Sequence, residues 1–439
     1  MRDWRRHGFR ALLVAWILSL SFACRTSDRP KARNAILISL DTLRADHLGC
    51  YGYHRETSPH IDALAREGIL FDRAIAQATS TLPSHRSLFQ SKPASETRKF
   101  ALTFARVLQR TGFQTAAFTG GGNVAGKLGL SSGFDVYEEY PGGLADGLPQ
   151  MESWLRKNGS SPFLVFLHTY DIHLPYDPPS PYDSLFYPQY EGPISGSDTR
   201  DVLRKIRGLP SKVGDLSLTE EDRQKIVALY DGGIRYADEY IGRLSDLLEE
   251  LGLAENTALV LLADHGEEFW DHGSVIHAHT LYEEQIRVPL IWRLPQNEFA
   301  GLHVEGVVRL LDVAPTVLEL LGVDTPPQFY GDSLLPMMRG EEEGSRKALS
   351  EIRLLKTWTA FPWKIHTDGT TGEARLFNLE LDPREEIDLS EGHREVMQSL
   401  RTELRDYLGG DSTTDVLERD PEIQDEDLLD QLRALGYIQ

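Results

Sequence analysis

The chain contains 439 residues, of which 41% are hydrophobic, so it is long enough and apolar enough to bury a large core. Its 46 lysines and arginines and 67 aspartates and glutamates give a formal net charge of −21, which excludes general binding to nucleic acid or to anionic membrane surfaces. An anionic substrate would therefore have to be held by local cations, either a metal ion or arginine and lysine side chains.

The first 24 residues have the pattern of an export signal. Arginines crowd the first ten residues, an apolar stretch covers 11–22, and Ser21-Phe22-Ala23 matches a small-x-small cleavage site. Cys24 follows directly, which favours a bacterial lipoprotein anchor; plain secretion and an uncleaved anchor remain alternatives, because Leu20 lies one place too far from the cysteine for the usual lipobox. Cys50 is the only other cysteine, so no disulfide framework is expected. We expect a periplasmic or cell-envelope protein whose membrane contact is at most a lipid on Cys24.

Three apolar runs have the composition of strands buried on both faces of a parallel sheet, and each is followed by carboxylate and imidazole side chains. In open α/β sheets, ligands gather beyond the carboxyl ends of the strands, and carboxylates beside imidazoles are typical metal ligands. The runs are residues 35–40 before Asp41, residues 162–167 before Asp171 and His173, and residues 258–263 before Asp264 and His265.

Thr81 precedes a predicted helix, because Pro83 is suited to a first helical turn. Free backbone N–H groups and the positive end of the helix dipole make such a position a ready anion site. A hydroxyl held there beside a metal can lose its proton and become a nucleophile. The alternative is that Thr81 or Ser80 is simply a helix N-cap.

The rest of the chain alternates helical and strand patterns, as is typical of an α/β domain. Predicted helices cover 59–67, 102–108, 220–251 and 312–321, and predicted strands cover 114–119 and 287–292. Residues 178–218 are rich in Pro, Ser, Gly and Asp and predict a surface excursion that shapes substrate specificity.

The pattern changes beyond residue 336. Short strands at 363–365 and 375–379 and a helix at 394–408 predict a small antiparallel sheet with a helix packed on it. We therefore divide the chain into a signal peptide (1–24), a catalytic domain (34–336), a C-terminal subdomain (345–410) and an acidic tail (411–439).

Taken together, these stretches resemble the sulfatase family within the alkaline phosphatase superfamily. The resemblance extends over about residues 34–388 and rests on four segments and their order: 40–49, 81–84, 171–176 and 263–267. It implies an α/β fold with a central, mostly parallel sheet sandwiched by helices, and a smaller C-terminal antiparallel sheet plus helix.

The resemblance also implies a metal site. Carried over by position, Asp41, Asp264 and His265 would hold a divalent cation, with the oxygen of Thr81 facing it. Zinc, manganese and calcium are the candidate ions, and one ion is expected.

Histidines supply the remaining implied roles. His173, together with His277 or His279, would contact the transferred anion or protonate the leaving group. The family often has lysine where His277 falls. A second ion held by Asp171 with His277 or His279 stays open as an alternative.

Three departures from the family pattern bear on the chemistry. Formylglycine-dependent sulfatases make their aldehyde from cysteine or serine, and Thr81 cannot give that aldehyde. His85 stands where the family has arginine, four places after the nucleophile. Thr42 stands where a second metal-binding aspartate is usual, which shifts the site from calcium towards zinc or manganese.

The resulting hypothesis is an exported, metal-dependent hydrolase of sulfate or phosphate esters with Thr81 as nucleophile, favouring phosphoesters. Its substrate would be a small molecule or a glycan or lipid ester. The alternatives are a phosphoethanolamine-type head-group transferase and a catalytically silent sulfatase-fold binding protein.

Overall fold

The computed structural model describes residues 32–209, 211–212, 214, 217–409, 428 and 431. The predicted signal peptide and Cys24 lie outside the described residues, as does the acidic tail apart from Leu428 and Gln431. Across the described chain, none of the helices combines the length and apolarity needed to cross a bilayer.

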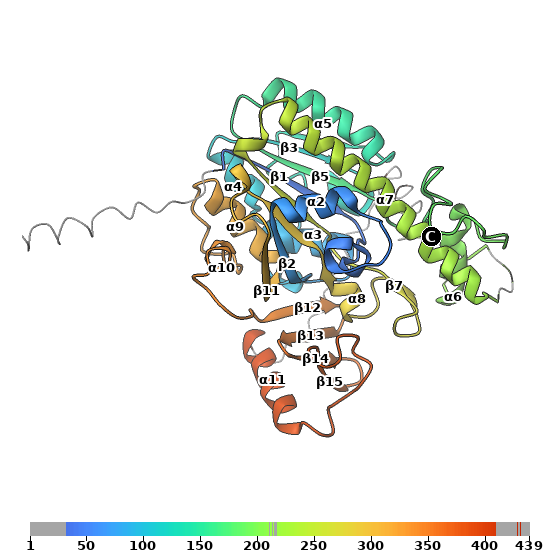
Figure 1. Ribbon diagram of the computed structural model, residues 1–439. Helices are drawn as coiled ribbons and strands as arrows, with labels where there is room; N and C mark the ends of the chain where they lie inside the picture. The colour runs from blue at the N-terminus through green and yellow to red at the C-terminus, as the bar shows by residue number, and fades with distance from the viewer. Residues whose placement is uncertain are drawn as a thin grey trace, which may run out of the picture.

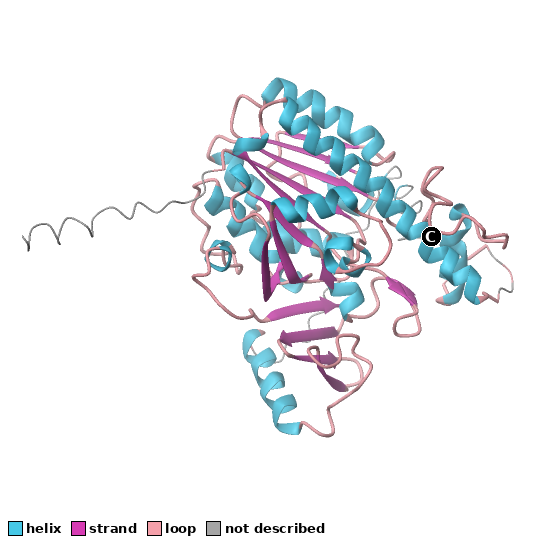
Figure 2. Ribbon diagram, in the orientation of Figure 1, coloured by secondary structure: helices cyan, strands magenta, loops and turns pink. Residues whose placement is uncertain are grey.

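A nine-stranded mixed sheet forms the centre of the larger lobe (Figures 1 and 2). Its strands are β1 (Asn34–Leu40), β2 (Ile69–Ile75), β3 (Gln114–Thr119), β4 (Val136–Glu139), β5 (Phe163–Thr169), β6 (Thr257–Leu262), β9 (Arg287–Val288), β10 (Leu290–Arg293) and β11 (Leu302–Arg309). They lie in the order β11-β2-β10-β6-β1-β5-β3-β4, with β9 paired to β2. From β6 to β4 all neighbours are parallel, whereas β10 runs antiparallel to β6 and to β2.

Helices flank this sheet in two groups. The helices of the chain are α2 (Pro59–Glu67), α3 (Thr81–Gln90), α4 (Phe104–Arg110), α5 (Leu144–Asn158), α6 (Thr199–Ile206), α7 (Glu220–Glu250), α8 (Glu283–Ile286), α9 (Val313–Leu320), α10 (Leu335–Met338) and α11 (Arg394–Tyr407). Helices α2 and α5 pack against the long α7, and α3, α4 and α9 pack against one another. Figure 1 shows α5 and α7 side by side along the upper edge of the view.

The parallel core explains why the apolar runs could be recognised in the sequence. Every residue of β1, β5 and β6 is buried, because helices cover both faces of the sheet. In these strands polar and apolar residues do not alternate as they do in a strand with one exposed face. Each strand is therefore a continuous apolar run followed directly by polar residues. The predicted fold class, an α/β sandwich with a mostly parallel sheet, is confirmed.

The C-terminal subdomain forms a second lobe, drawn below the central sheet in Figure 1. Strands β12 (Ala348–Ile352), β13 (Leu355–Ala360), β14 (Trp363–Asp368) and β15 (Ala374–Asn378) make an antiparallel sheet in that order. Helix α11 covers it by packing Met397, Leu400 and Leu404 against Trp358 and Ile365. The predicted small sheet with one helix is thus confirmed.

The residue 178–218 segment is less irregular than its composition indicates. It contains α6, whose Val202 and Leu203 are buried against the body of the protein. Strands β2 and β11 were not predicted, because polar residues such as Asp72 and Arg73 interrupt the apolar pattern of β2. These two strands are stabilised by pairing and burial within the sheet, which the local sequence pattern does not show.

A buried ion cluster joins the two lobes. The ammonium of Lys364, on β14, lies 2.9 Å from a carboxylate oxygen of Glu283 at the start of α8 and 3.0 Å from one of Glu385. His366 contacts the same Glu385 carboxylate at 2.7 Å. Burial opposes ionisation of Glu385, but Lys364 and His366 outweigh it and lower its pKa to about 2.

Lys364→Ala should lower the free energy of unfolding by about 3–5 kcal/mol, because the buried Glu385 and the partly buried Glu283 carboxylates lose their counter-charge. In the wild type, the contribution of Glu385 should be complete above its unfolded pKa and disappear as the pH falls towards about 2. Urea unfolding at several pH values measures both effects. Lys347→Ala is the control, because its pair with Glu403 is half exposed and should contribute only about 0–1 kcal/mol.

Candidate active site

Two carboxylates and an imidazole converge at one end of the parallel sheet. Asp41 follows β1, and Asp264 and His265 follow β6, the parallel neighbour of β1. Because the pairing places Ser39 beside Leu262, the residues just beyond both strands meet at the same edge. One donor atom from each of the three residues lies within 4.8 Å of the other two, and all three side chains are fully buried.

The orientation of these donors fits a cation. Asp41 Oδ1 and Asp264 Oδ2 are buried without any hydrogen-bond partner, which is costly for carboxylate oxygens. His265 donates from Nδ1 to the carbonyl oxygen of Gly266 at 3.0 Å, so Nε2 carries the lone pair of the neutral ring. That Nε2 lies 3.4 Å from Asp264 Oδ2 and 4.0 Å from Asp41 Oδ1. Two carboxylates and one imidazole suit zinc or manganese better than calcium.

The pKa values of these groups are shifted because the groups are buried close to one another. Burial, together with the charge of Asp264, raises the pKa of Asp41 well above its ordinary value. For His265, burial acts to lower the pKa, but Asp264 and Asp41 outweigh it and raise the pKa. Burial acts to raise the pKa of Asp264, but the charges of His265, His85 and His168 outweigh it and lower that pKa.

Thr81 lies beside this cluster at the N-terminus of α3. It is the first residue of the helix, with Ser80 as the N-cap, rather than the residue ahead of the helix. Its hydroxyl oxygen is 3.4 Å from His265 Nε2, and a hydrogen bond from Thr81 acts to lower the pKa of Asp41. Thr81 is fully buried, so its hydroxyl faces the cluster and not bulk water.

His85 cannot be the cationic clamp that arginine would provide in the family pattern. It donates from Nδ1 to the carbonyl oxygen of Thr81 at 2.8 Å, and its Nε2 accepts from the Ser39 hydroxyl at 3.0 Å. Burial lowers its pKa to about 4, so the ring is neutral at pH 7. The adjacent Arg86 donates to the carbonyl oxygen of Leu128. His85 therefore anchors the first turn of α3 under Thr81.

Thr42 is not oriented as a ligand either. Its hydroxyl donates to the backbone oxygen of Asp41 at 2.6 Å, and its φ of 61° puts it in the left-handed region. This conformation is uncommon for a β-branched residue and turns the Thr42 backbone N–H towards Asp264 Oδ1, at 3.4 Å. Thr42 therefore supports Asp264 through its backbone.

His168 is a site residue that the sequence reasoning missed. It lies near the end of β5, paired in register with Ser39 of β1, and its Nε2 is 3.3 Å from Asp41 Oδ2. Burial lowers its pKa to about 4. The available signal was its place one strand away from Asp41 at the same edge of the sheet.

A second imidazole group borders the cluster. The ring of His277 lies 4.5 Å from that of His265 and 5.1 Å from that of His173, measured between centroids. Glu267, also missed as a site residue, accepts from His277 Nδ1 at 2.9 Å and from the Tyr176 hydroxyl at 2.7 Å. Burial lowers the pKa of both His173, to about 3, and His277.

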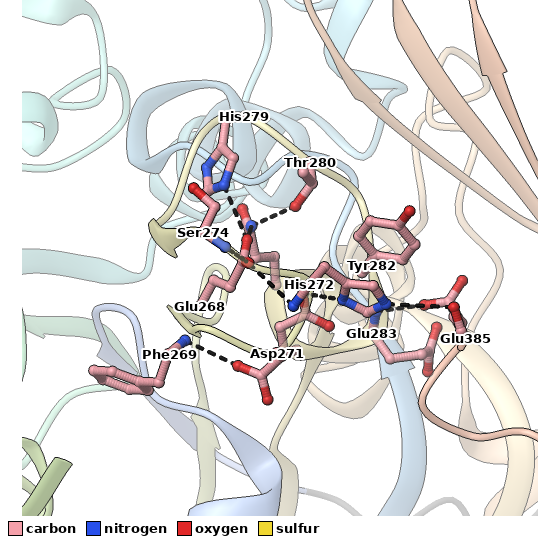
Figure 3. Close-up of polar contacts among 12 residues, drawn as sticks. Glu268, Phe269, Asp271, His272, Ser274, His279, Thr280, Tyr282, Glu283 and Glu385 are labelled. Carbon is pink, nitrogen blue, oxygen red and sulfur yellow. Dashed lines mark hydrogen bonds and ion pairs between the residues drawn. The ribbon is translucent and has the colours of Figure 1, made fainter. Parts of the chain in front are cut away.

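His279 lies in a different environment. Its Nε2 is 2.9 Å from Glu268 Oε2, and its Nδ1 contacts the backbone oxygen of His277 at 3.1 Å. Figure 3 shows this contact beside the bonds from the backbone nitrogens of His272 and Ser274 to the same Glu268. Of the two histidines, His277 therefore faces the cluster.

The loop that carries these histidines is held from both sides. It contains the short hairpin β7 (Glu268–Phe269) and β8 (Val275–Ile276). His272 stacks on Tyr282 with ring centroids 3.5 Å apart and contacts the backbone oxygen of Glu385 (Figure 3). The C-terminal lobe thus fixes the loop that positions His277.

Asp171 does not join a second metal group. Its carboxylate accepts from the Leu144 backbone N–H at 2.8 Å and from the Thr169 hydroxyl at 2.6 Å, so it caps α5. Within the described parts of the chain, Asp41, Asp264 and His265 are the single three-donor group close enough for an ion. The structure gives the alternative of a second ion at Asp171 no support there.

Comparison with known proteins shows which family and which fold this chain shares. The Sulfatase family model matches residues 33–323. The chain is 24% identical to N-acetylglucosamine-6-O-sulfatase of Bacteroides thetaiotaomicron over 91% of each chain. A structure solved with its substrate D-glucosamine-2-N,6-O-disulfate superposes with a TM-score of 0.73 and 21% identity, covering 90% of this chain and all of the other. Phosphonate monoester hydrolase of Agrobacterium radiobacter gives a TM-score of 0.67 and 21% identity, over 84% and 95%.

Proposed function

The chain belongs to the sulfatase family, the hydrolases of sulfuric and phosphoric ester bonds, and we propose that it is a metal-dependent member with Thr81 as nucleophile. The observation that carries the proposal is the placement of the Thr81 hydroxyl 3.4 Å from His265 Nε2, among carboxylate oxygens that have no hydrogen-bond partner. A silent binding protein would have no reason to keep such costly buried groups.

Asp41, Asp264 and His265 would hold the metal, and the Thr81 oxygen faces the same space. A bound divalent cation would supply Lewis-acid stabilisation of negative charge and would lower the pKa of a neighbouring hydroxyl. His168 keeps the Asp41 carboxylate oriented through its second oxygen.

In the first step, the Thr81 oxygen attacks the central phosphorus or sulfur in line with the ester bond. The bond from the central atom to the Thr81 oxygen forms as the bond to the leaving oxygen breaks; the hydroxyl proton of Thr81 is released to water, and the leaving oxygen takes a proton from a histidine. The backbone N–H groups at the start of α3 and its dipole stabilise the equatorial oxygens of the transferred group.

His277 is the better proton donor for the leaving oxygen. Its Nδ1 is bonded to the Glu267 carboxylate, which stabilises a protonated imidazole when the anionic ester binds. His173 instead donates from Nδ1 to the neutral carbonyl oxygen of Leu174, at 2.7 Å. We therefore assign His277 as the acid and His173 as a contact for the transferred anion.

Threonine favours phosphorus over sulfur as the central atom. A formylglycine hydrate has a second hydroxyl that can expel bound sulfate, whereas a threonine ester has none. A phosphothreonine can be hydrolysed by water attacking phosphorus, which breaks the bond to the Thr81 oxygen and returns the proton to it. The proposed natural substrate is therefore a phosphoester or phosphonate ester of a small molecule, glycan or lipid.

A panel of nitrophenyl esters tests the proposal. Purified protein supplied with zinc or manganese should release nitrophenol from phosphate diester or phosphonate monoester analogues faster than from the sulfate. Faster release from the sulfate would contradict the phosphoester assignment, and the absence of release from any ester would contradict the hydrolase assignment.

His277→Ala should lower kcat about 10²–10⁴-fold for a phenyl ester, which needs protonation of its leaving oxygen. The nitrophenyl ester should lose less than about tenfold, because nitrophenolate leaves without a proton. His173→Ala is the matched variant and should raise KM similarly for both esters. If His173→Ala shows the leaving-group dependence instead, the two roles are exchanged.

We also propose that the protein is exported, from the signal-like pattern of its first 24 residues. Fractionation of expressing bacteria should place it in the periplasm or envelope, and Cys24→Ser should release it from membranes if that cysteine carries a lipid.

A further inference from the structure

Arginine side chains from two separate parts of the chain lie at the His277 side of the candidate site. Arg207, directly after α6, donates from Nη1 to the backbone oxygen of His277 at 3.0 Å. Arg353 lies in the tight turn between β12 and β13 of the C-terminal lobe, and its charge lies close enough to act on the pKa of Arg207. Two cations from distant segments therefore approach one another next to the proposed acid.

The two nearby carboxylates form hydrogen bonds with groups other than Arg207. Glu267 accepts from His277 and Tyr176, and Glu268 accepts from the His272 and Ser274 backbone N–H groups. In the described chain, Arg207 forms no ion pair with a carboxylate. Burial lowers the pKa of Arg207; the charges of Glu267 and Glu268 act to raise it and those of Arg353 and Arg204 to lower it, and the net shift is downward.

Arg353 adopts an unusual backbone conformation for a large residue. Its φ is 52°, in the left-handed region that tight hairpin turns require and that glycine or asparagine adopt most easily. The Arg353 side chain is exposed and contributes nothing to the core of the hairpin. Among the described residues, no hydrogen bond or ion pair of the Arg353 side chain offsets the conformational cost of arginine at this position.

Helix α6 carries further arginines next to Arg207. Arg200, Arg204 and Arg207 are spaced by four and three residues, so they share one face of the helix. Val202 and Leu203 anchor α6 on the protein, and the helix contacts β8, the strand that directly precedes His277. This local concentration of positive charge contrasts with the net charge of −21.

We propose that Arg207 and Arg353 form a subsite for a second anionic group of the substrate, carried by its leaving group. This inference rests on the proposed function, because His277 protonates the leaving oxygen and Arg207 is bonded to His277 itself. A second anionic group on the leaving part would contact Arg207, beside His277, together with the neighbouring charge of Arg353. The substrate class is therefore an ester whose alcohol part carries a further carboxylate, sulfate or phosphate group.

Matched esters test the subsite. The 4-nitrophenyl and 3-carboxy-4-nitrophenyl esters of the acid preferred in the panel differ by one carboxylate on the leaving group. Wild-type kcat/KM should be about tenfold higher for the carboxylated ester at low ionic strength, and added salt should reduce this ratio.

Two variants and a control assign the effect to residues. Arg207→Gln and Arg353→Gly should each bring the ratio close to one. Arg353→Gly should unfold at the same or a higher temperature than the wild type, because glycine relieves the left-handed conformation. Lys205→Gln removes an equal charge from an exposed position of α6 and should leave the ratio unchanged.

A binding measurement separates this inference from the proposed function. Calorimetric titration with benzylphosphonate and 4-carboxybenzylphosphonate, which have no ester bond to cleave, should show tighter binding of the carboxylated compound only while Arg207 and Arg353 are present. If this binding difference appears but no ester is hydrolysed, the subsite stands and the proposed function fails. If esters are hydrolysed but neither ratio depends on the two arginines, the subsite is wrong and the proposed function stands.

Discussion

Thr81→Ala should lower kcat/KM for the preferred nitrophenyl ester by about a thousandfold or more, because the alanine variant has no oxygen to form the covalent intermediate. The Thr81 hydroxyl is buried at the N-terminus of α3, and among the described residues it is the hydroxyl that contacts His265 Nε2. The remaining activity would come from water attacking an ester held by the same cation and helix N-terminus.

Thr81→Ser is the matched control for this prediction. Serine keeps the hydroxyl and suits the start of a helix, so kcat should stay within about tenfold of the wild type. Rapid acid quenching during turnover should trap phosphate on Thr81, detectable by mass spectrometry as a phosphothreonine. Full activity of Thr81→Ala would show that water, and not Thr81, attacks the substrate.

The cluster of Asp41, Asp264 and His265 could be predicted from sequence because its signal is local. A strand buried on both faces is apolar throughout, so the carboxylates of Asp41 and Asp264 stand out directly after β1 and β6. The parallel sheet then brings both strand ends to the same edge without any further information. The family resemblance added Thr81, whose position at the start of α3 is likewise encoded locally.

The residues that orient the cluster were not predictable in the same way. His168 and Glu267 occupy ordinary positions beside strand ends, and their roles depend on which oxygen or nitrogen they meet across the sheet. His85 stands where the family pattern has arginine, and its neutral ring holds the α3 turn instead of providing a cation. Such roles depend on which side chains meet when strands that are far apart in the sequence pair in the sheet.

The proposed arginine subsite, Arg207 and Arg353, was even harder to predict from the sequence. Arg207 lies in a segment whose composition predicts an irregular excursion, and Arg353 lies in the C-terminal lobe. Neither residue belongs to a recognisable motif. Their approach depends on the docking of the C-terminal lobe, which Lys364 secures through Glu283 and Glu385.

Removal of the metal should have a large effect on both activity and stability. If the protein is saturated with zinc or manganese at about 100 times the dissociation constant, chelation should lower the free energy of unfolding by about 2.7 kcal/mol. Turnover should fall by about a thousandfold, because the cation contributes several kcal/mol of charge stabilisation to the transition state. Elemental analysis should give one ion per chain before chelation and none after it.

Asp41→Asn should separate these two effects. The variant should bind no ion and lose turnover as chelation does, yet at neutral pH its metal-free form should be at least as stable as the metal-free wild type. The reason is that burial and Asp264 raise the pKa of Asp41, so its ionised form is unfavourable in the metal-free fold. The metal-free wild type should gain stability as the pH falls through the raised pKa of Asp41 towards its unfolded value of about 3.9, and the variant should lack this gain.

Asp171→Asn is the control for Asp41→Asn, because Asp171 also follows a buried strand but caps α5 instead of facing the cluster. It should keep one ion per chain. Metal retention by Asp41→Asn, or metal loss in Asp171→Asn, would contradict the assignment of the cation to the β1 and β6 strand ends. Asp41 and Asp264 are far apart in the sequence and meet only because β1 and β6 are neighbours in the sheet. Loss of the ion in Asp41→Asn together with its retention in Asp171→Asn would therefore locate the ion at the ends of β1 and β6.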